Sequence, residues 1–378
     1  MRLLRALHAW AGLLLALLVA TIALSGALLV FKGDYLRAVF PAARQVPATD
    51  AAALGAVVDR VEQQFGDEAR SVVFGTARMG LHQVHLVDGG GAYVDRAGNI
   101  VDRWSPRARP EIWLFDLHQK LLAGDTGHVV GGVAGLLVAV MTVTGLVVWW
   151  PGGVRSFRGR LWPGSTKRPA LLAHHRDLGL VAALPLLLSS LTGAALVFSD
   201  EAKAVLSFLL PQGEVATTAT ATAASAAAIP TAVTNGEGWA AVLTRAQARF
   251  PDATLRIVAF PREEPGIATV RLKQPAEWHP NGRTRVTLAL ASATVVSAHD
   301  ATREPLSARV YNASYPLHAA RIGGRAYEVL VAGAGLALVL LSLVGAYSFG
   351  ALQVRRTRRR LEETAAARLA AATPARND

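Results

Sequence analysis

The sequence predicts an α-helical membrane protein with four transmembrane helices in two parallel repeats, plus two small α/β modules outside the membrane. Composition gives the first indication, because 52% of the 378 residues are hydrophobic and only 17% are charged, against roughly 25% in soluble proteins. The second is a set of four uncharged apolar runs, and the third is a histidine pattern that recurs in the second half. The chain has no cysteine, which excludes disulfides, thiolate metal sites, iron–sulfur clusters and covalently attached c-type haem.

Each apolar run is 22 to 25 residues long, enough to cross roughly 30 Å of hydrocarbon as a helix that rises about 1.5 Å per residue. The runs are Ala9–Phe31, Val129–Trp150, Leu178–Ser199 and Val329–Gln353. The first run follows two arginines, as a signal sequence does, but it offers no convincing small-residue cleavage site. We therefore expect it to be an uncleaved membrane anchor.

Basic residues lie close to the ends of these runs, and Lys and Arg near a span resist translocation and stay in the cytoplasm. They form three clusters: Arg2 and Arg5; Arg155, Arg158, Arg160, Lys167 and Arg168; and Arg355, Arg356, Arg358, Arg359 and Arg360. Both termini are therefore expected in the cytoplasm, and the long segments after the first and third runs on the outer side. The net charge of +12 then reflects topology and contact with anionic membrane lipid, not nucleic-acid binding.

Each outer segment has the pattern of a small α/β module, a helix followed by short alternating strands. The first module has a helix over Ala51–Phe65 and strands around Ser71–Phe74, His82–Val87 and Ala92–Arg103. The second has a helix over Trp239–Phe250 and strands near Leu255–Ala259, Ile267–Leu272, Arg285–Leu290 and Thr294–Ala298. An Ala/Thr-rich tract, Val215–Thr234, is expected to be a flexible linker, and the residues from Ala365 onward a frayed tail.

The chain is thus expected to divide into eight segments. They are 1–31, N-terminus and first helix; 32–116, first module; 117–151, outer histidine segment and second helix; 152–174, cytoplasmic loop; 175–199, third helix; 200–316, linker and second module; 317–353, outer histidine segment and fourth helix; and 354–378, basic tail.

The two halves carry the same residue types at the same spacing. In each half a hydroxyl residue and a glycine lie 17 and 18 residues after one histidine, and another glycine lies 27 residues after a second histidine. The first-half positions are His8, Ser25-Gly26, His118 and Gly145, and their counterparts are His175, Thr192-Gly193, His318 and Gly345. This spacing predicts two parallel repeats related by a pseudo-two-fold axis along the membrane normal.

The repeat places two histidine pairs at matched depths. Under the expected topology, His8 and His175 lie near the cytoplasmic face, and His118 and His318 lie near the outer face. A six-coordinate b-type haem takes one neutral imidazole from each side of its iron. The sequence therefore predicts two b-type haems, each held by one of these pairs as axial ligands.

Other residues near these positions have alternative roles. His174 competes with its neighbour for the first haem, and His128 is either a supporting group or an alternative outer ligand. Gly12 and Gly179, one turn after their histidines, would leave room for a porphyrin against the backbone. A lone histidine at a membrane boundary is more often an interfacial polar residue, and surface roles are expected for His82, His85, His279 and His299. Arginines that neighbour the ligands and could pair haem propionates are Arg176, Arg321 and Arg325.

The chain resembles the PepSY-associated transmembrane family, which includes iron-regulated inner-membrane proteins and ferric-siderophore reductases. The matching stretches are Leu7-His8-Ala9-Trp10-Ala11-Gly12 with Leu24-Ser25-Gly26, Leu117-His118 through Thr144-Gly145 to Trp149-Trp150-Pro151, His175-Arg176-Asp177-Leu178-Gly179 with Leu191-Thr192-Gly193, and Leu317-His318 with Gly323-Gly324. In the fourth helix Val344-Gly345 and Tyr347 replace the Thr-Gly and terminal Trp of the family pattern, which changes packing residues and leaves His318 intact.

This resemblance implies a bis-histidine dihaem oxidoreductase of the bacterial inner membrane, with two periplasmic domains. It would carry electrons from quinol or a cytoplasmic reductase to a ferric siderophore in the periplasm, and it would need no catalytic residues beyond the haem ligands. The resemblance leaves a second possibility, a non-haem PepSY-type regulator or binding module that acts on periplasmic partners or peptidases. A transporter is disfavoured, because all four runs lack ionisable residues at mid-span.

Overall fold

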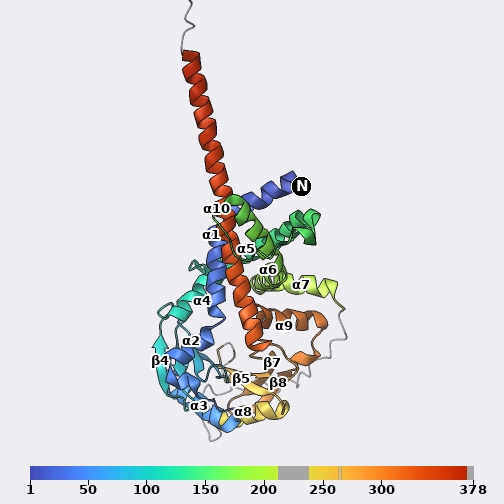
Figure 1. Ribbon diagram of the computed structural model, residues 1–378. Coiled ribbons are helices and arrows are strands. Elements are labelled where there is room, and N and C mark those ends of the chain that lie inside the picture. The colour runs from blue at the N-terminus through green and yellow to red at the C-terminus, as the bar shows by residue number, and fades with distance from the viewer. Residues whose placement is uncertain (212–237, 263, 265, 373–378) are drawn as a thin grey trace, which may run out of the picture. The chain divides into compact units, whose positions relative to one another are not determined.

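The computed structural model describes residues 1–211, 238–262, 264 and 266–372 (Figure 1). The expected linker over Val215–Thr234 lies outside these residues. The chain divides into two compact units. The helical unit comprises Met1–Ala27, Val133–Leu191 and Ala332–Asp378, and the sheet unit comprises Leu28–Gly132 and Thr192–Val331.

Within the described residues, four helices are long and apolar enough to cross a membrane. They are α1 (Arg2–Leu29), α5 (Gly124–Trp149), α6 (Arg168–Val197) and α10 (Gly324–Ala372), and the short 3-10 turns η3 (Trp150–Gly152) and η4 (Val154–Ser156) follow α5. Each helix contains one of the apolar runs. All four helices begin earlier than the runs. In α1 and α6 the added residues include Arg, Leu and Ala, which are good helix formers even where the sequence is no longer apolar.

Small side chains let the helices of the helical unit approach closely. A core of α6 and α10 residues contains Ala182, Leu186, Ala334, Ala337 and Leu341. Where α10 meets α1, a Cβ added to Gly335 would lie 3.0 Å from the backbone oxygen of Ala23, so only glycine fits there. This is the packing expected of membrane helices, which gain little from burying apolar surface against one another and depend on close contact instead.

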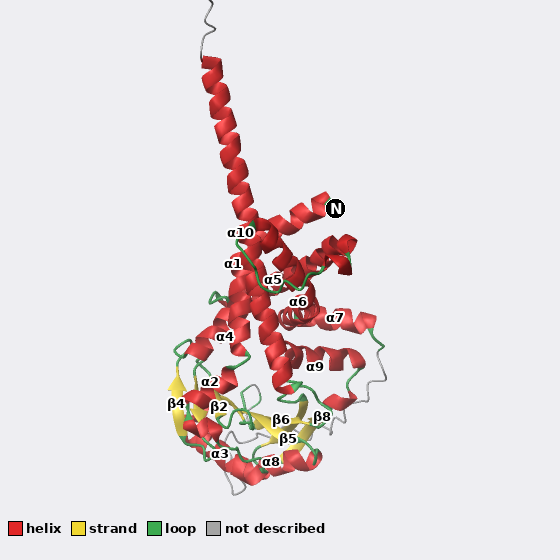
Figure 2. Cartoon of the chain, viewed as in Figure 1, coloured by secondary structure: helices red, strands yellow, loops and turns green. Residues whose placement is uncertain are grey.

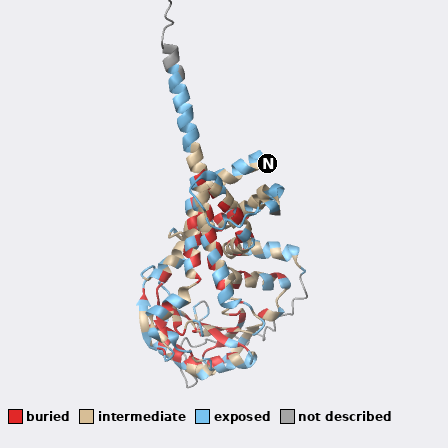
Figure 3. Cartoon of the chain, in the orientation of Figure 1, coloured by how far each residue is buried: buried red, intermediate tan, exposed pale blue. Residues whose placement is uncertain are grey.

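The end of α10 differs from the expected frayed tail. The helix continues to Ala372, and residues 373–378 lie outside the described part. Arg358 and Arg359 each form an ion pair with the glutamate four residues on, both at 2.8 Å. Such pairs and the alanine content favour a helix, although this stretch is exposed and has no core to pack on (Figure 3).

The sheet unit contains the remaining elements (Figure 2). From the first half of the chain they are α2 (Lys32–Val39), η1 (Pro41–Arg44), α3 (Ala51–Phe65), η2 (Gly66–Glu68), β1 (Ala69–Val73), β2 (His82–Leu86), β3 (Gly91–Val94), β4 (Ile100–Trp104) and α4 (Pro110–Lys120). From the second half they are α7 (Ser199–Leu209), α8 (Gly238–Arg249), β5 (Thr254–Ala259), β6 (Ile267–Lys273), β7 (Thr284–Ala289), β8 (Thr294–His299), η5 (Ala301–Arg303) and α9 (Leu306–His318). The order of a long helix, a short helix, a helix with four strands, a short helix and a long helix thus occurs in both halves.

The two expected modules are not separate, because their strands form one eight-stranded sheet in the order β4-β3-β2-β1-β5-β6-β7-β8. The two halves join where β1 pairs antiparallel with β5, with Val72 opposite Val258. This pairing satisfies backbone groups that would otherwise remain exposed at the edge of each half-sheet. The sequence pattern shows which segments are strands and does not show which strands are neighbours.

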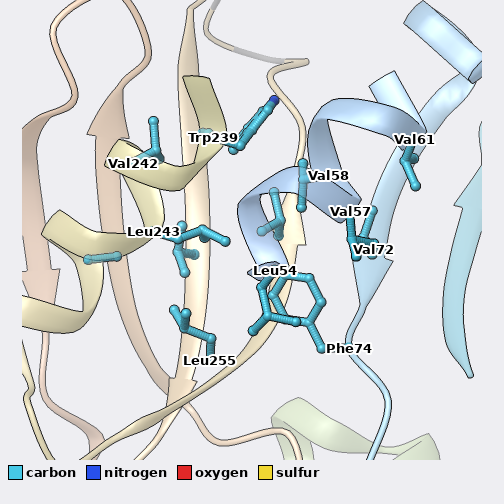
Figure 4. Packing of buried hydrophobic residues seen from close by; sticks show 14 of the residues in the cluster. Leu54, Val57, Val58, Val61, Val72, Phe74, Trp239, Val242, Leu243 and Leu255 are labelled. Atoms are coloured by element: carbon cyan, nitrogen blue, oxygen red, sulfur yellow. The ribbon is translucent and has the colours of Figure 1, made fainter. Parts of the chain in front are cut away.

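Helices α3 and α8 pack on one face of this sheet and form its core with residues of both halves (Figures 3 and 4). Leu54, Val58 and Leu243 are at most 1% exposed. Trp239 joins the helices by polar contacts as well, since its backbone N–H donates to Asp59 Oδ1 at 3.1 Å and its indole N–H donates to Glu62 Oε2 at 2.9 Å. The shared core makes the two halves one folding unit on this side.

Two of the four histidines expected on the surface are buried. His82 is fully buried on the face of β2 that α3 and α8 cover, where its Nδ1 accepts a hydrogen bond from the backbone N–H of Gly75 at 3.1 Å. His279 is 7% exposed and stacks on Tyr315, with ring centroids 5.0 Å apart. His85 and His299 are partly exposed, as expected. The alternation of residues along a strand predicts which side chains share a face of the sheet. It does not predict which of the two faces the helices cover.

The Gly55→Ala substitution tests the close contact of α3 and α8. A Cβ at this position would overlap the backbone of Ala240, which cannot rotate away, so the helices would have to separate. We expect a net loss of about 1 to 3 kcal/mol of unfolding free energy despite the higher helix propensity of alanine. Thermal unfolding followed by tryptophan fluorescence measures it. The control is Gly164→Ala, where the added Cβ meets no described atom within 4 Å, and equal midpoints in the two variants would contradict the prediction.

His82 should make stability depend on pH. Burial lowers the pKa of His82 to about 4, Arg256 lowers it further and Asp95 opposes this, whereas the unfolded chain keeps a pKa near 6.5. As pH falls through 6.5 toward 4, the unfolded state therefore gains a proton that the folded state does not take. The stability lost over this window is about 3 kcal/mol, at about 1.4 kcal/mol per pKa unit.

The measurement is the unfolding midpoint between pH 7 and pH 4 for the wild-type chain and for His82→Asn. Asparagine keeps an acceptor at the position of Nδ1 but does not titrate, so the variant should lose stability less steeply on acidification. Identical pH profiles would show that His82 is not the group responsible.

Candidate functional site

His8 on α1 and His175 on α6 face each other in the helical unit. Their ring centroids are 6.4 Å apart and their planes are inclined by 84°. Each ring also lies against a glycine of another helix, since a Cβ on Gly145 would be 3.4 Å from His8 Cε1 and one on Gly345 would be 3.3 Å from His175 Cε1. The pair is therefore held by four helices, α1, α5, α6 and α10.

Hydrogen bonds assign the tautomer of His8. Its Nδ1 lies 3.0 Å from Thr144 Oγ1, and that hydroxyl donates its own hydrogen to the backbone oxygen of Met141, also at 3.0 Å. Because the hydroxyl hydrogen is already used, Thr144 accepts and His8 Nδ1 carries the proton. The lone pair of His8 is then on Nε2, which is the form that a metal ligand requires.

His175 has a different supporting group. Val344 occupies the position that matches Thr144 and has no hydroxyl. The backbone carbonyl of Leu341 interacts with the His175 ring, although Nδ1 makes no hydrogen bond of standard geometry within the described residues. The two imidazoles of the pair are therefore supported by different groups, a threonine hydroxyl for His8 and a backbone carbonyl for His175.

The second pair lies in the sheet unit, where His118 on α4 and His318 at the end of α9 have ring centroids 5.9 Å apart and planes inclined by 30°. Gly193 on α6 makes room for this pair, because a Cβ there would be only 2.7 Å from His318 Cε1. The structure thus brings together the two histidine pairs that the repeat spacing predicts.

Both separations fit one metal ion between two imidazoles. With metal–nitrogen bonds of about 2.0 Å and ring nitrogens roughly 1.15 Å from the ring centroid, two opposite imidazoles have centroids about 6.3 Å apart. The observed values are 6.4 and 5.9 Å. In the described part of the chain, no group of three or more His, Asp or Glu side chains is arranged to hold a metal ion. A pair of imidazoles without further protein ligands suits a metal whose other ligands come with it, as the porphyrin nitrogens of haem do.

Gly12 and Gly179, predicted to leave room for a porphyrin, do not border the histidine rings. Gly12 faces Met141 Cε, 3.2 Å from its added Cβ, and Gly179 faces Leu341 Cδ2 at 3.8 Å. Those positions therefore contact flexible side chains, while Gly145 and Gly345 lie against the imidazoles. Their signal in the sequence is the glycine 27 residues after each outer histidine, which also marks the repeat.

The two competing histidines have other surroundings. His174 is fully buried, and neither ring nitrogen has a hydrogen-bond partner among the described residues, but it forms no ring contact with His8. His128 Nδ1 lies 3.2 Å from the backbone oxygen of Gln119, next to His118. His128 therefore contacts the backbone of α4, the helix that carries His118, which fits the expected supporting role.

Two of the three neighbouring arginines are already paired with carboxylates. Arg176 contacts Asp177 at 2.7 Å, and Arg325 contacts Asp34 at 2.6 Å. Arg321 lies among other cations, since burial lowers the pKa of Lys32 and of Arg78 and the charge of Arg321 lowers both further. Carboxylates lie in the same region, since Arg78 pairs with Glu328 and the charge of Glu111 raises the pKa of Lys32. A propionate role of Arg321 therefore stays a prediction.

A buried glutamate fixes the start of α4, the helix that carries His118. Glu111 is 4% exposed and accepts hydrogen bonds from the hydroxyl of Tyr93 at 3.1 Å and from Arg109 Nε at 2.7 Å. Arg109 also pairs with Asp102 on β4. Burial and the charge of Glu111 raise the pKa of Tyr93, which keeps its hydroxyl a donor.

Helix α9, which carries His318, is fixed in the same way from the second half. Glu304, just before the helix, contacts His299 Nε2 of β8 at 2.7 Å and accepts a hydrogen bond from Asn312 Nδ2 of α9 at 2.6 Å. Each histidine of this pair is therefore on a short helix that a carboxylate ties to the sheet, Glu111 directly to Tyr93 of β3 and Glu304 directly to His299 of β8.

Comparison with known proteins places the chain in a family. The model of the PepSY-associated TM region matches residues 5–350, which include all four apolar helices and both histidine pairs. Comparison with curated proteins gives no match. Because the match covers most of the sequence, the chain is a multi-pass membrane protein and belongs to the PepSY-associated transmembrane family.

Proposed function

We propose that this protein is a dihaem electron-transfer protein of the bacterial inner membrane that reduces ferric siderophore in the periplasm. The observation that carries the proposal is the two histidine pairs, each with a centroid separation close to the value that one iron ion between two imidazoles requires. The tautomer assigned to His8, with Nε2 free, supports it further. The pairs lie on helices from different halves of the chain, so both halves contribute to each proposed haem.

The basic clusters give the direction of transfer. They predict that the start of α1 and the end of α10 face the cytoplasm, so His8 and His175 would lie on that side and His118 and His318 toward the periplasm. Electrons from quinol or a cytoplasmic reductase would enter near the first pair and leave near the second.

Haem supplies a one-electron couple, and the chain supplies the ligands and the surroundings. Held by the two histidine pairs, haem would supply the one electron that iron(III) in the siderophore needs, and no atom would be transferred. Iron(II) is held less tightly by hard oxygen ligands such as hydroxamates, so reduction releases the metal for uptake. The periplasmic protein surface therefore needs to dock the chelate and needs no acid, base or nucleophile.

An absorption spectrum of the purified protein tests the proposal directly. Oxidised and dithionite-reduced samples should show the Soret and visible bands of six-coordinate b-type haem, at two haems per chain. A colourless protein, expressed with an adequate haem supply, would refute it and favour the alternative, a PepSY-type regulator or binding module without haem.

Single ligand replacements test the pairing. His8→Ala or His175→Ala should remove one haem, and His118→Ala or His318→Ala should remove the other, because an axial ligand is lost in each case. His174→Ala serves as the control beside the first pair and should leave two haems. Loss of both haems, or of neither, after a ligand replacement would contradict the assignment.

Thr144→Val tests how His8 is supported. Without its acceptor, His8 becomes a less basic ligand that stabilises iron(III) less, so the midpoint potential of the haem lost in His8→Ala should rise. The expected rise is roughly 20 to 40 mV, since one hydrogen bond of about 1 kcal/mol corresponds to about 40 mV for one electron.

The midpoint potential is measured by redox titration. The matched control is Thr142→Val, two residues earlier on the same helix. The hydroxyl of Thr142 donates to the backbone oxygen of Val138 of its own helix at 2.8 Å and supports no histidine. Its potential should equal that of the wild type. An equal shift in both variants, or a shift of the other haem in Thr144→Val, would rule out the specific role of Thr144.

A further inference from the structure

A cavity of about 240 Å³ lies in the sheet unit between α9 and the connection that joins β6 to β7. The connection contributes Trp278, His279 and Arg283, and α9 contributes Arg309 and Val310. Both walls are built from the second half of the chain, and α9 ends at His318, one of the proposed haem ligands.

The connection is held rigid by Glu277, which uses its carboxylate inside the loop. Its Oε2 accepts from the backbone N–H of Gln274 at 2.8 Å and from the hydroxyl of Thr284 at 3.1 Å. Its Oε1 accepts from the backbone N–H groups of Arg283 and Thr284. A carboxylate with its oxygens occupied in this way fixes the loop and is a poor partner for the arginine side chains around it.

The side chains around the cavity carry an excess of positive charge. Arg283 Nε is buried without a hydrogen-bond partner among the described residues, and Arg309 is exposed on α9. Arg271 and Arg285 lie directly opposite each other on β6 and β7. Burial lowers the pKa of Arg271, and the charges of Arg283 and Arg285 lower it further. Arg271 and Arg285 lie outside the lining of the cavity, and Glu277 partly offsets their effect by raising the pKa of Arg271. Arg283 and Arg309 are the arginines that line the cavity itself.

His279 adds no charge to the cavity and links it to α9. Burial lowers its pKa to about 3, with Arg283 and Arg271 adding to the effect, so the ring is neutral at physiological pH. The ring stacks on Tyr315, with centroids 5.0 Å apart and planes inclined by 29°. Tyr315 lies three residues before His318 on α9, and Arg309 lies nine residues before it, about 14 Å along a helix.

We infer that this cavity binds the acidic arm of an anionic, carboxylate-bearing ferric chelate. The inference rests on the proposed function and names the substrate class: Arg283 and Arg309 bind the carboxylate, and the indole of Trp278, which is 60% exposed, packs on the rest of the molecule. At about 240 Å³ the cavity is smaller than a site that encloses a whole drug-sized ligand, so the iron-bearing part of the chelate stays outside. Neutral and cationic chelates gain nothing from these arginines.

Calorimetric titration of the full-length protein in neutral phosphatidylcholine nanodiscs tests the inference. The probes are gallium citrate, which is anionic, and gallium desferrioxamine B, which carries a positive charge. Gallium(III) copies the size and charge of iron(III) but does not accept an electron here, so binding is measured independently of haem and of reduction. We expect gallium citrate to bind at least tenfold more tightly than the cationic probe.

Substitutions locate the site. Arg283→Gln and Arg309→Gln should each weaken gallium citrate binding about tenfold, the loss expected for one charge-assisted hydrogen bond, and leave the cationic probe unaffected. Arg283→Gln keeps the backbone N–H that binds Glu277. Arg309→Lys should recover part of the affinity. The control is Arg96→Gln, an exposed arginine in the turn between β3 and β4 at the other edge of the sheet, which should bind like the wild type.

Three results would overturn the inference: equal affinity for the two probes, equal losses in Arg96→Gln, or unchanged binding in both arginine variants. The inference also fails if anionic phosphatidylglycerol in the nanodisc competes with gallium citrate and Arg283→Gln abolishes this competition. That result would assign the cavity to a lipid headgroup. If the protein lacks haem but binds gallium citrate as expected, the electron-transfer proposal fails and the anion site stands. If the protein holds two haems and reduces anionic and cationic chelates equally, the anion site fails and the electron-transfer proposal stands.

Discussion

The separation of the two imidazole rings in each histidine pair, 6.4 and 5.9 Å between centroids, depends on both halves of the chain at once. Neither half can set it alone, because His8 and His118 each have their partner ring in the second half. One helix fixes the position of one imidazole ring. The separation between two rings is fixed only when both of the helices that carry them are fixed. The glycines that border the rings, the buried glutamate that anchors α4 and the single continuous sheet all act on this separation.

One continuous sheet connects the two halves of the chain, and these halves carry His118 on α4 and His318 on α9. Each helix follows the last strand of its half and is tied to the sheet by a carboxylate, Glu111 to Tyr93 of β3 and Glu304 to His299 of β8. The strands of the two halves meet through β1 and β5, and α3 and α8 close one core over both. A shift of one half-sheet against the other would therefore move His118 relative to His318, whereas two separate modules would leave the two rings uncoupled.

The secondary-structure elements and the histidine pairs could be predicted from the sequence. Few of the contacts that support the histidines could be predicted. Charge and apolar length locate the four helices, and equal spacing pairs His8 with His175, because both signals are local or periodic along the chain. The union of the half-sheets, the burial of His82 and the contact of Gly145 with His8 depend on which surfaces meet, which no local pattern encodes. Helix α10 runs past Ala365 because exposed Arg–Glu pairs favour a helix without burying it.

The two halves differ at some positions that the repeat would make equivalent. Thr144 becomes Val344, so one histidine of the first pair receives a hydroxyl acceptor and the other a backbone carbonyl. His128 becomes Glu328, which is 1% exposed and contacts Arg325 at 3.0 Å, while His128 contacts the backbone beside His118. Each change leaves the paired histidines in place and alters the groups around them. A pair built from two unequal halves can support its two imidazoles differently, which an exactly symmetric pair cannot do.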